Sequence, residues 1–280
     1  MRYKQWKIAH PAPVGRAQLE RAGIPSLLAC VLSARGVTEP EQAWKLLTPG
    51  EEPLLDPMLL KDMDRAVLRV GRALKTGELM AVYGDYDVDG ITSTCLLTDC
   101  LTRLGGRVRS YIPDRLEEGY GLNEEAVLHL AQQGVTLIIT VDCGITAVKE
   151  AEYLKAQGID LVVTDHHEPQ DELPDCIVAD AKIDRQGFSD LCGAGVALKL
   201  VAALFGKEYE KYLDICAIAT IADVVPLVGD NRIIAYHGLR QCASSPRRGI
   251  KMLAGTEKLS SQDVMFRLAP RINAAGRLGS

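Results

Sequence analysis

The 280-residue sequence lacks several features that would each define a class of protein. No apolar run reaches the roughly 20 residues that a membrane-spanning helix needs, and the first residues, Met-Arg-Tyr-Lys-Gln-Trp-Lys, lack the apolar core of a signal peptide. The eight cysteines include no Cys-x-x-Cys pair and lie mostly in apolar patterns, which indicates reduced core thiols and no zinc site. We therefore expect a globular protein with a cytoplasmic location and no membrane partner.

An excess of positive charge is also absent. The formal net charge is −5, which argues against a general basic coat for nucleic acid but does not exclude a local basic groove. Part of the negative charge comes from carboxylates that we expect to bind metal, and the metal would offset it. Net charge is therefore a weak guide to the substrate.

The chain is organised around one stretch, from Met80 to Thr94. The apolar run Leu79–Tyr83 predicts a buried strand, which Gly84 ends. Three aspartates then follow at alternate positions, namely Asp85, Asp87 and Asp89.

Carboxylates this close repel one another and would be pushed towards protonation unless a cation or hydrogen-bond donors kept them ionised. A hard divalent ion such as Mg²⁺ or Mn²⁺ prefers oxygen ligands and fits this stretch. The alternative is a simple polar turn, with Asp89 capping a helix that begins near Ile91.

Apolar strands and helical patterns alternate from Leu79 onward. This alternation predicts an α/β domain with a doubly wound, mostly parallel five-stranded sheet flanked by helices. The expected strands are Leu79–Tyr83, Val108–Ile112, Thr136–Val141, Leu161–Thr164 and Ile177–Ala179, and the expected helices lie near 91–104, 123–133, 145–157 and 193–206.

Three segments are expected along the chain. Residues 1–60 form an accessory segment, with a short strand at Trp6–Ile8, a helical stretch at Leu19–Arg35 and a helix that Thr38 caps. Residues 61–225 form the catalytic domain, which opens with an amphipathic helix, Met63–Thr76. Residues 226–280 form a helical extension.

Parallel sheets bind their ligands at the carboxyl ends of the strands. The three alternate aspartates follow the first predicted strand, Asp142 follows the third, and Asp165, His166 and His167 follow the fourth. Three strand ends thus bring acid or histidine to one edge. Asp223 follows an apolar helical run and can close the site. A lone Asp after a strand is usually a helix cap and adjacent histidines are usually a surface pair, but three coincidences favour a site for two Mn²⁺ or Mg²⁺ ions that hydrolyses phosphate esters.

Four segments resemble, in order and context, the four motifs of the DHH phosphoesterase superfamily. They are Asp85-Tyr-Asp-Val-Asp-Gly, Val141-Asp-Cys-Gly-Ile, Thr164-Asp-His-His-Glu-Pro and Ala222-Asp-Val-Val-Pro-Leu-Val-Gly-Asp-Asn-Arg. Three flanking segments resemble more narrowly the RecJ-like exonucleases, which digest single-stranded DNA from 5′ to 3′. They are Leu59-Leu-Lys-Asp-Met-Asp, Ile112-Pro-Asp-Arg-Leu-Glu-Glu-Gly-Tyr-Gly-Leu-Asn and Ala269-Pro-Arg-Ile-Asn-Ala-Ala-Gly-Arg-Leu-Gly. The resemblance covers nearly the whole chain.

The resemblance implies a set of metal ligands: Asp87, Asp89, Asp142, His166 and Asp223. Asp142 would bridge two ions, and Asp85 and Asp165 would be further ligands or residues that orient the ligands. His167 would face the scissile phosphate, stabilising charge or acting as general acid, or would bind metal as well.

The resemblance also implies three contacts with nucleic acid. Arg115 and Arg277 would contact phosphates, and Tyr120 would stack or wedge against a base. Alternatively, Arg115 pairs with Glu117 at the surface and Tyr120 is a core aromatic. We expect His10, His129 and His237 to be structural or surface residues.

Two departures accompany the resemblance. RecJ-like chains continue into a second domain that closes over the site, so we expect this sequence to be the catalytic part of a longer protein. Asp180-Ala181-Lys182 stands where the family usually has Asn-Pro-Lys, beside the site.

The implied function is degradation of single-stranded DNA to mononucleotides in recombination and repair, with a single-strand-binding protein and a helicase as partners. One alternative is a DHH phosphodiesterase that acts on short oligonucleotides or cyclic dinucleotides, without the flanking segments. Another is a replication scaffold that has lost its metal ligands, although all of them are present here.

Overall fold

The computed structural model describes residues 7–48, 52–115, 117–184, 187–255 and 259–275. The chain divides into two compact units, Met1–Glu52 and Pro53–Ser280. The domain boundaries expected at residues 60 and 225 stay predictions.

The described part of the smaller unit forms the helices α1 (Pro13–Arg21), α2 (Ser26–Ala34) and α3 (Pro40–Leu47), which pack around Leu19 and Leu32. The helical stretch expected at 19–35 is divided because Gly23 has a φ of +85° and a proline follows at position 25. Helix α3 has Glu39 at its cap position, without a side-chain cap bond, so the expected cap at Thr38 is wrong. The residues described in the expected strand at 6–8, Lys7 and Ile8, have no regular structure.

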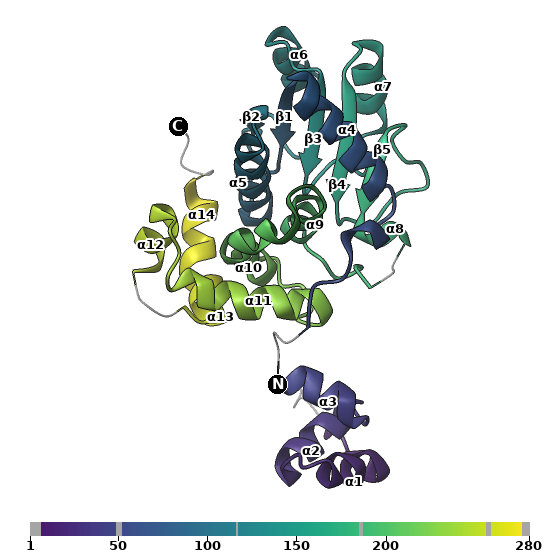
Figure 1. Ribbon diagram of the computed structural model, residues 1–280, viewed down its shortest axis with the longest axis vertical. Helices are drawn as coiled ribbons and strands as arrows, with labels where there is room; N and C mark the ends of the chain where they lie inside the picture. The colour runs from purple at the N-terminus through teal and green to yellow at the C-terminus, as the bar shows by residue number, and fades with distance from the viewer. Residues whose placement is uncertain (1–6, 49–51, 116, 185–186, 256–258, 276–280) are drawn as a thin grey trace, which may run out of the picture. The chain divides into compact units, whose positions relative to one another are not determined.

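The larger unit is built on a five-stranded sheet in the order β2-β1-β3-β4-β5 (Figure 1). The strands are β1 (Leu79–Tyr83), β2 (Arg107–Tyr111), β3 (Leu137–Val141), β4 (Asp160–Asp165) and β5 (Ile177–Asp180), and every pair is parallel. The predicted strands are thus confirmed, with ends that differ by no more than one residue. The strand order places β1 and β3 side by side although α5, β2 and α6 separate them in the chain.

The helical elements of the larger unit are η1 (Pro57–Leu59), α4 (Met63–Thr76), α5 (Val88–Arg103), α6 (Glu124–Gln132), α7 (Val148–Ala156), α8 (Ala181–Asp184), α9 (Gly193–Phe205), η2 (Gly206–Tyr212), α10 (Leu213–Ala222), α11 (Gly229–Cys242), α12 (Arg248–Ala254), α13 (Ser261–Asp263), η3 (Val264–Leu268) and α14 (Ala269–Ala275). Helix α4 has the predicted bounds and ends at Gly77, which has a φ of +71°. Within the described ranges, no helix is long and apolar enough to cross a membrane.

Both faces of the sheet are buried, as a doubly wound fold requires. Met80 and Val82 of β1 pack on one face with residues of α4, α5, α9 and α10, whereas Ala81 and Tyr83 pack on the other with residues of α6 and α7. The first of these clusters also takes in buried residues of the C-terminal helices, including Ile234 and Leu268. Because every pair of strands is parallel, all five strands end at the same edge of the sheet, and the loops after β1, β3, β4 and β5 meet there.

Candidate metal centre

The loop after β1 turns directly into α5. Asp87 is the cap of this helix, and its Oδ1 accepts a hydrogen bond of 3.0 Å from Gly90 N. The alternative in which Asp89 is the cap is therefore wrong, since Asp89 lies within the first turn. A Cβ at Gly90 would lie 2.4 Å from the Asp85 carbonyl oxygen, so glycine lets the helix start against the buried Asp85.

Asp89 is held by a second helix that is distant in sequence. Its Oδ2 accepts 2.6 Å from Gly193 N and its Oδ1 accepts 2.7 Å from Ala194 N. These are the first amides of α9, where the helix dipole also favours a negative charge. This role of α9 was not predicted from the sequence. The Gly-Ala-Gly at its start was the available signal, because small residues let a carboxylate approach the amides.

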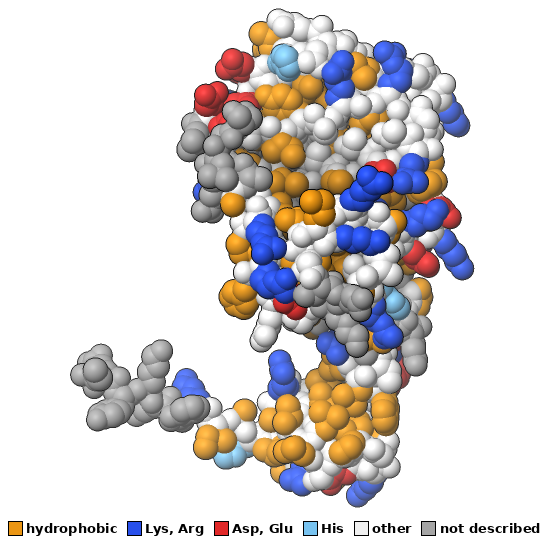
Figure 2. Space-filling model, turned by 90° about the vertical axis from the view of Figure 1, so that its left-hand side faces the viewer, with side chains coloured by type: hydrophobic (Ala, Val, Ile, Leu, Met, Phe, Trp, Pro, Cys, Tyr) orange, Lys and Arg blue, Asp and Glu red, His pale blue; other side chains and the backbone are white. Residues whose placement is uncertain are grey.

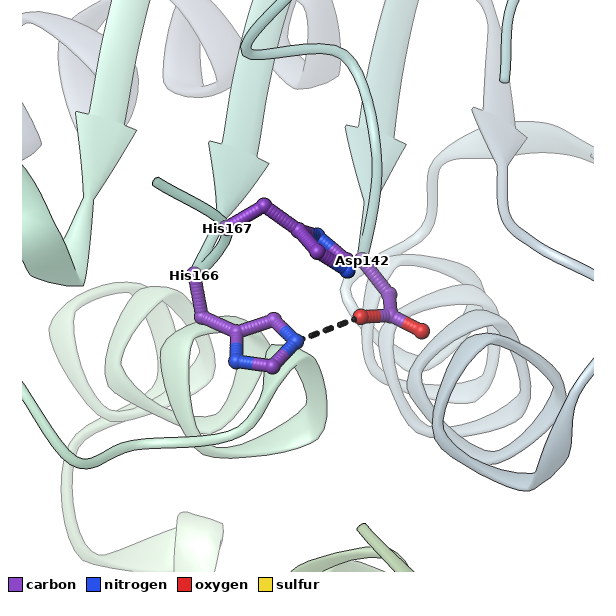
Figure 3. A group of neighbouring side chains, drawn as sticks. All are labelled: Asp142, His166 and His167. Carbon is purple, nitrogen blue, oxygen red and sulfur yellow. Dashed lines mark ion pairs between the residues drawn. The ribbon is translucent and has the colours of Figure 1, made fainter. Parts of the chain in front are cut away.

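Asp142 follows β3 in a left-handed conformation, with a φ of +60°. This conformation is uncommon outside glycine, although aspartate tolerates it better than most residues. It turns the carboxylate towards His166, whose Nε2 lies 3.0 Å from Asp142 Oδ1 (Figure 3). The same His166 nitrogen is 3.7 Å from Asp89 Oδ2, and His166 Nδ1 is 3.9 Å from Asp223 Oδ2.

Asp165 ends β4 and is completely buried. Its Oδ1 accepts from His166 N at 2.7 Å and from His167 N at 3.3 Å, and its Oδ2 accepts from Ile145 N at 2.9 Å. His167 Nδ1 lies 2.8 Å from the same Oδ1. These contacts support the role of a residue that orients the two histidines, and Asp165 belongs to none of the metal-binding groups found among the described residues.

Three groups of side chains can each hold one metal ion. They are Asp142, His166 and His167; Asp89, His166 and Asp223; and Asp85, Asp87 and Asp142, and within each group the ligand atoms lie within 4.8 Å of one another. The residues fit Mn²⁺ or Mg²⁺ because Asp85 Oδ1 and Asp142 Oδ1 are buried and accept no hydrogen bond. A cation would satisfy both oxygens.

Burial raises the pKa of most acids in this centre. The pKa rises to about 6 for Asp85 and Asp223 and to about 7 for Asp89, and it lies well above its usual value for Asp142. Repulsion among neighbouring carboxylates adds to this effect. A divalent ion would reverse both effects, and its binding would release protons.

The pKa values of the two histidines shift in opposite directions. Burial lowers the pKa of His166 to about 4, so its ring is neutral near pH 7 and keeps a nitrogen lone pair for a metal. The contact with Asp165 raises the pKa of His167. For Asp165, burial opposes ionisation, but the bond with His167 and the surrounding amides outweigh it and lower its pKa.

The residues expected to contact nucleic acid lie differently. Tyr120 is half exposed and touches His167, so it belongs to the centre and is no core aromatic. The Arg115 guanidinium lies over the ring of Tyr86, 5.0 Å from its centroid, next to the loop after β1. Arg277 lies outside the described residues. Of the remaining histidines, His129 contacts Gln133 at the surface.

Asp180 is a buried acid that the sequence analysis noticed only as a departure from the family pattern. It ends β5 in register with Asp165, and its Oδ2 has no hydrogen-bond partner. Burial raises its pKa to about 7. Its position at a strand end was the signal that could have placed it beside the centre.

The sheet and the convergent acids and histidines define an α/β protein with a centre for divalent metal at the carboxyl edge of its strands. A family model described as the DHH family, N-terminal domain, matches residues 80–220. The chain belongs to the DHH family.

Several relatives that are 35% to 42% identical are RecJ proteins, so the resemblance predicted from the motifs is confirmed. The single-stranded-DNA-specific exonuclease RecJ of Bacillus subtilis is 42% identical over an alignment that covers 98% of this chain and 36% of the relative. The structure of Thermus thermophilus RecJ with Mn²⁺ matches with a TM-score of 0.82 and 33% identity, over 97% of this chain and 40% of that one. The structure of the same protein with Mg²⁺ matches with a TM-score of 0.71 and 29% identity, again over 97% of this chain, and over 37% of that one. The chain thus spans between about a third and a half of the length of these relatives.

Proposed function

We propose that this chain is the catalytic part of a metal-dependent phosphodiesterase that degrades single-stranded DNA from 5′ to 3′ into mononucleotides, in recombination and repair. One observation carries the proposal: the metal-binding groups overlap. Asp142 and His166 each belong to two of the three groups. The two groups without His167 lie next to each other, because His166 Nε2 of one is 3.0 Å from Asp142 Oδ1 of the other. A close pair of ions serves in-line displacement at phosphorus.

The proposed ligands are Asp85, Asp87, Asp89, Asp142, His166 and Asp223, and Asp165 holds the histidines in place. The ions, Mn²⁺ or Mg²⁺, would activate a water and offset charge on the phosphate. We propose that His167 would face the scissile phosphate. The contact with Asp165 raises the pKa of His167, and a protonated ring can stabilise or protonate a leaving oxygen. The RecJ relatives, named as exonucleases specific for single-stranded DNA, support the substrate.

Contacts with the strand are proposed for Arg115, Tyr120 and Arg277. Figure 2 shows several Lys and Arg side chains on one face of the larger unit, which supports contact with a polyanion despite the net charge of −5. We also propose a single-strand-binding protein and a helicase as partners, and a cytoplasmic location. All eight cysteines are free thiols, which supports a reducing compartment.

The test is release of mononucleotides from 5′-phosphorylated single-stranded DNA in the presence of Mn²⁺. We expect Asp142→Ala to abolish release, because it removes the shared ligand. Asp175→Ala is the matched control: it makes the same change of charge, but Asp175 is exposed and precedes β5, away from the carboxyl edge.

A dinucleotide substrate run alongside separates the alternatives. Cleavage of the dinucleotide with the long strand intact would favour the short-oligonucleotide enzyme. Failure to bind metal together with failure to cleave either substrate would favour the scaffold, and bound metal with neither substrate cleaved would contradict the proposal.

A further inference from the structure

Tyr120 touches the proposed general acid in a way that the sequence did not indicate. Its hydroxyl oxygen lies 3.3 Å from His167 Nδ1 and 3.5 Å from His167 Nε2, so it faces the ring between the two nitrogens. The two rings meet edge to face, with centroids 5.8 Å apart. The hydroxyl is also within reach of the Asp142 carbonyl oxygen, at 3.4 Å.

The loop that carries Tyr120 is anchored on both sides. Before it, Tyr111 of β2 donates a hydrogen bond of 2.7 Å to Glu118 Oε2, and after it, Tyr83 of β1 donates one of 2.9 Å to the Gly121 carbonyl oxygen. Gly119 and Gly121 have φ values of +81° and +83°, which few other residues adopt. The position of the hydroxyl is therefore set by the sheet.

Apart from Tyr120, His167 contacts Asp165 and the ring of His166, whose centroid lies 4.5 Å from that of the His167 ring. Asp165 fixes Nδ1 and the backbone N–H, while the side chain of His167 is 45% exposed and could turn about its Cβ–Cγ bond. The contact with Tyr120 comes from a different loop. Asp165 and Tyr120 together define one orientation of the imidazole.

We propose that the Tyr120 hydroxyl is a positioning group for His167, a role separate from contact of the Tyr120 ring with a base. The inference rests on the proposed function, since it assumes that the orientation of His167 limits the reaction. If the His167 ring is turned away from its productive orientation, the activation barrier of the chemical step rises while substrate binding is unchanged. The half-exposed Tyr120 ring remains available to the strand.

Tyr120→Phe tests this role because it removes the hydroxyl and keeps the ring. We expect kcat on single-stranded DNA to fall between about tenfold and a hundredfold with KM unchanged. Tyr111→Phe is the matched control: it removes a hydroxyl that anchors the same loop without touching His167. Tyr120→Leu, which also removes the ring, should in addition raise KM.

A second readout does not depend on activity. Nuclear magnetic resonance of the imidazole, with the His167 signals assigned through His167→Asn, should show a larger shift in Tyr120→Phe than in Tyr111→Phe. If the wild-type chain has no nuclease activity but Tyr120→Phe still shows this shift, the proposed function is contradicted, whereas the contact between Tyr120 and His167 is supported.

Two results would overturn the proposal. One is wild-type kcat and an unshifted His167 signal in Tyr120→Phe. The other is an equal loss of kcat in Tyr120→Phe and Tyr111→Phe, which would mean that both hydroxyls only stabilise the loop.

Discussion

At the scale of single residues, the centre combines carboxylates with oxygens left free for a metal, such as Asp85 and Asp142, and carboxylates whose oxygens are already occupied by protein donors. Asp165 shows the second kind best, since backbone amides of three residues and one imidazole converge on its two oxygens. An ionised carboxylate accepts hydrogen bonds and donates none, unlike the amide of Asn, which is similar in size. The donors around position 165 therefore favour aspartate.

Asp165→Asn should therefore weaken the fold as well as the chemistry. The amide group of Asn must direct its N–H donors at amides that are also donors, and a buried mismatch of this kind costs about 1–3 kcal/mol. Urea unfolding should report this loss in the free energy of unfolding, whereas Asp160→Asn at an exposed ion pair should change it by less than about 1 kcal/mol. Equal stability of Asp165→Asn and the wild-type protein would show that the bonds to Asp165 are dispensable.

Sequence reasoning reached most of the residues in the centre. Asp85, Asp142 and His166 follow predicted strands, and the carboxyl ends of parallel strands lie at one edge whatever the conformation of the loops. It did not reach which acid caps α5 or which acid orients the histidines, because these roles depend on where the loops turn. The positive φ of Asp142 is one such detail that no local pattern carries.

At the scale of elements, the start of α9 is as much a part of the centre as the strand ends. A Cβ at Gly193 would lie 2.5 Å from Asp142 Cβ and 2.6 Å from Asp142 Oδ1. The helix can approach both Asp89 and Asp142 only because position 193 has no side chain. Strands and helices of this unit were predictable from their periods, but the contact between the starts of α9 and α5 joins residues that no pattern relates.

Gly193→Ala should thus disrupt the centre from outside the set of ligands. We expect α9 to shift, Asp89 to lose its amide donors, and Mn²⁺ affinity to fall about tenfold or more, which is the usual cost of losing a partner that orients a ligand. Isothermal titration calorimetry with Mn²⁺ measures this affinity. Gly71→Ala is the control, since a Cβ on Gly71 of α4 meets nothing within 4 Å. Unchanged metal affinity in Gly193→Ala would show that α9 does not position the ligands.

At the scale of the whole molecule, the centre opposes the stability of the fold until it binds metal. The pKa values of Asp85, Asp89 and Asp223 lie above those of an unfolded chain, so ionising these groups costs the metal-free protein stability as the pH rises through 6 to 7. An ion that binds the ionised carboxylates removes this cost.

Mn²⁺ should therefore raise the melting temperature more at about pH 8 than at about pH 5.5, where protons compete with the metal. A ligand at a hundredfold excess over its Kd adds about 2.7 kcal/mol, which calorimetry detects easily. Asp142→Ala should show little shift at either pH. A shift that is as large at acid pH would mean that the raised pKa values do not govern binding.

The bond between Asp89 and the start of α9 also bears on how the protein is made. Gly193 and Ala194 follow Asp89 by more than a hundred positions, and Asp223 comes later still. A growing chain on the ribosome that has not yet reached α9 has β1, β3 and β4 but lacks both the amides that hold Asp89 and the whole of Asp223. Synthesis itself thus delays the moment at which the proposed nuclease can act, until the residues that complete its centre have been added.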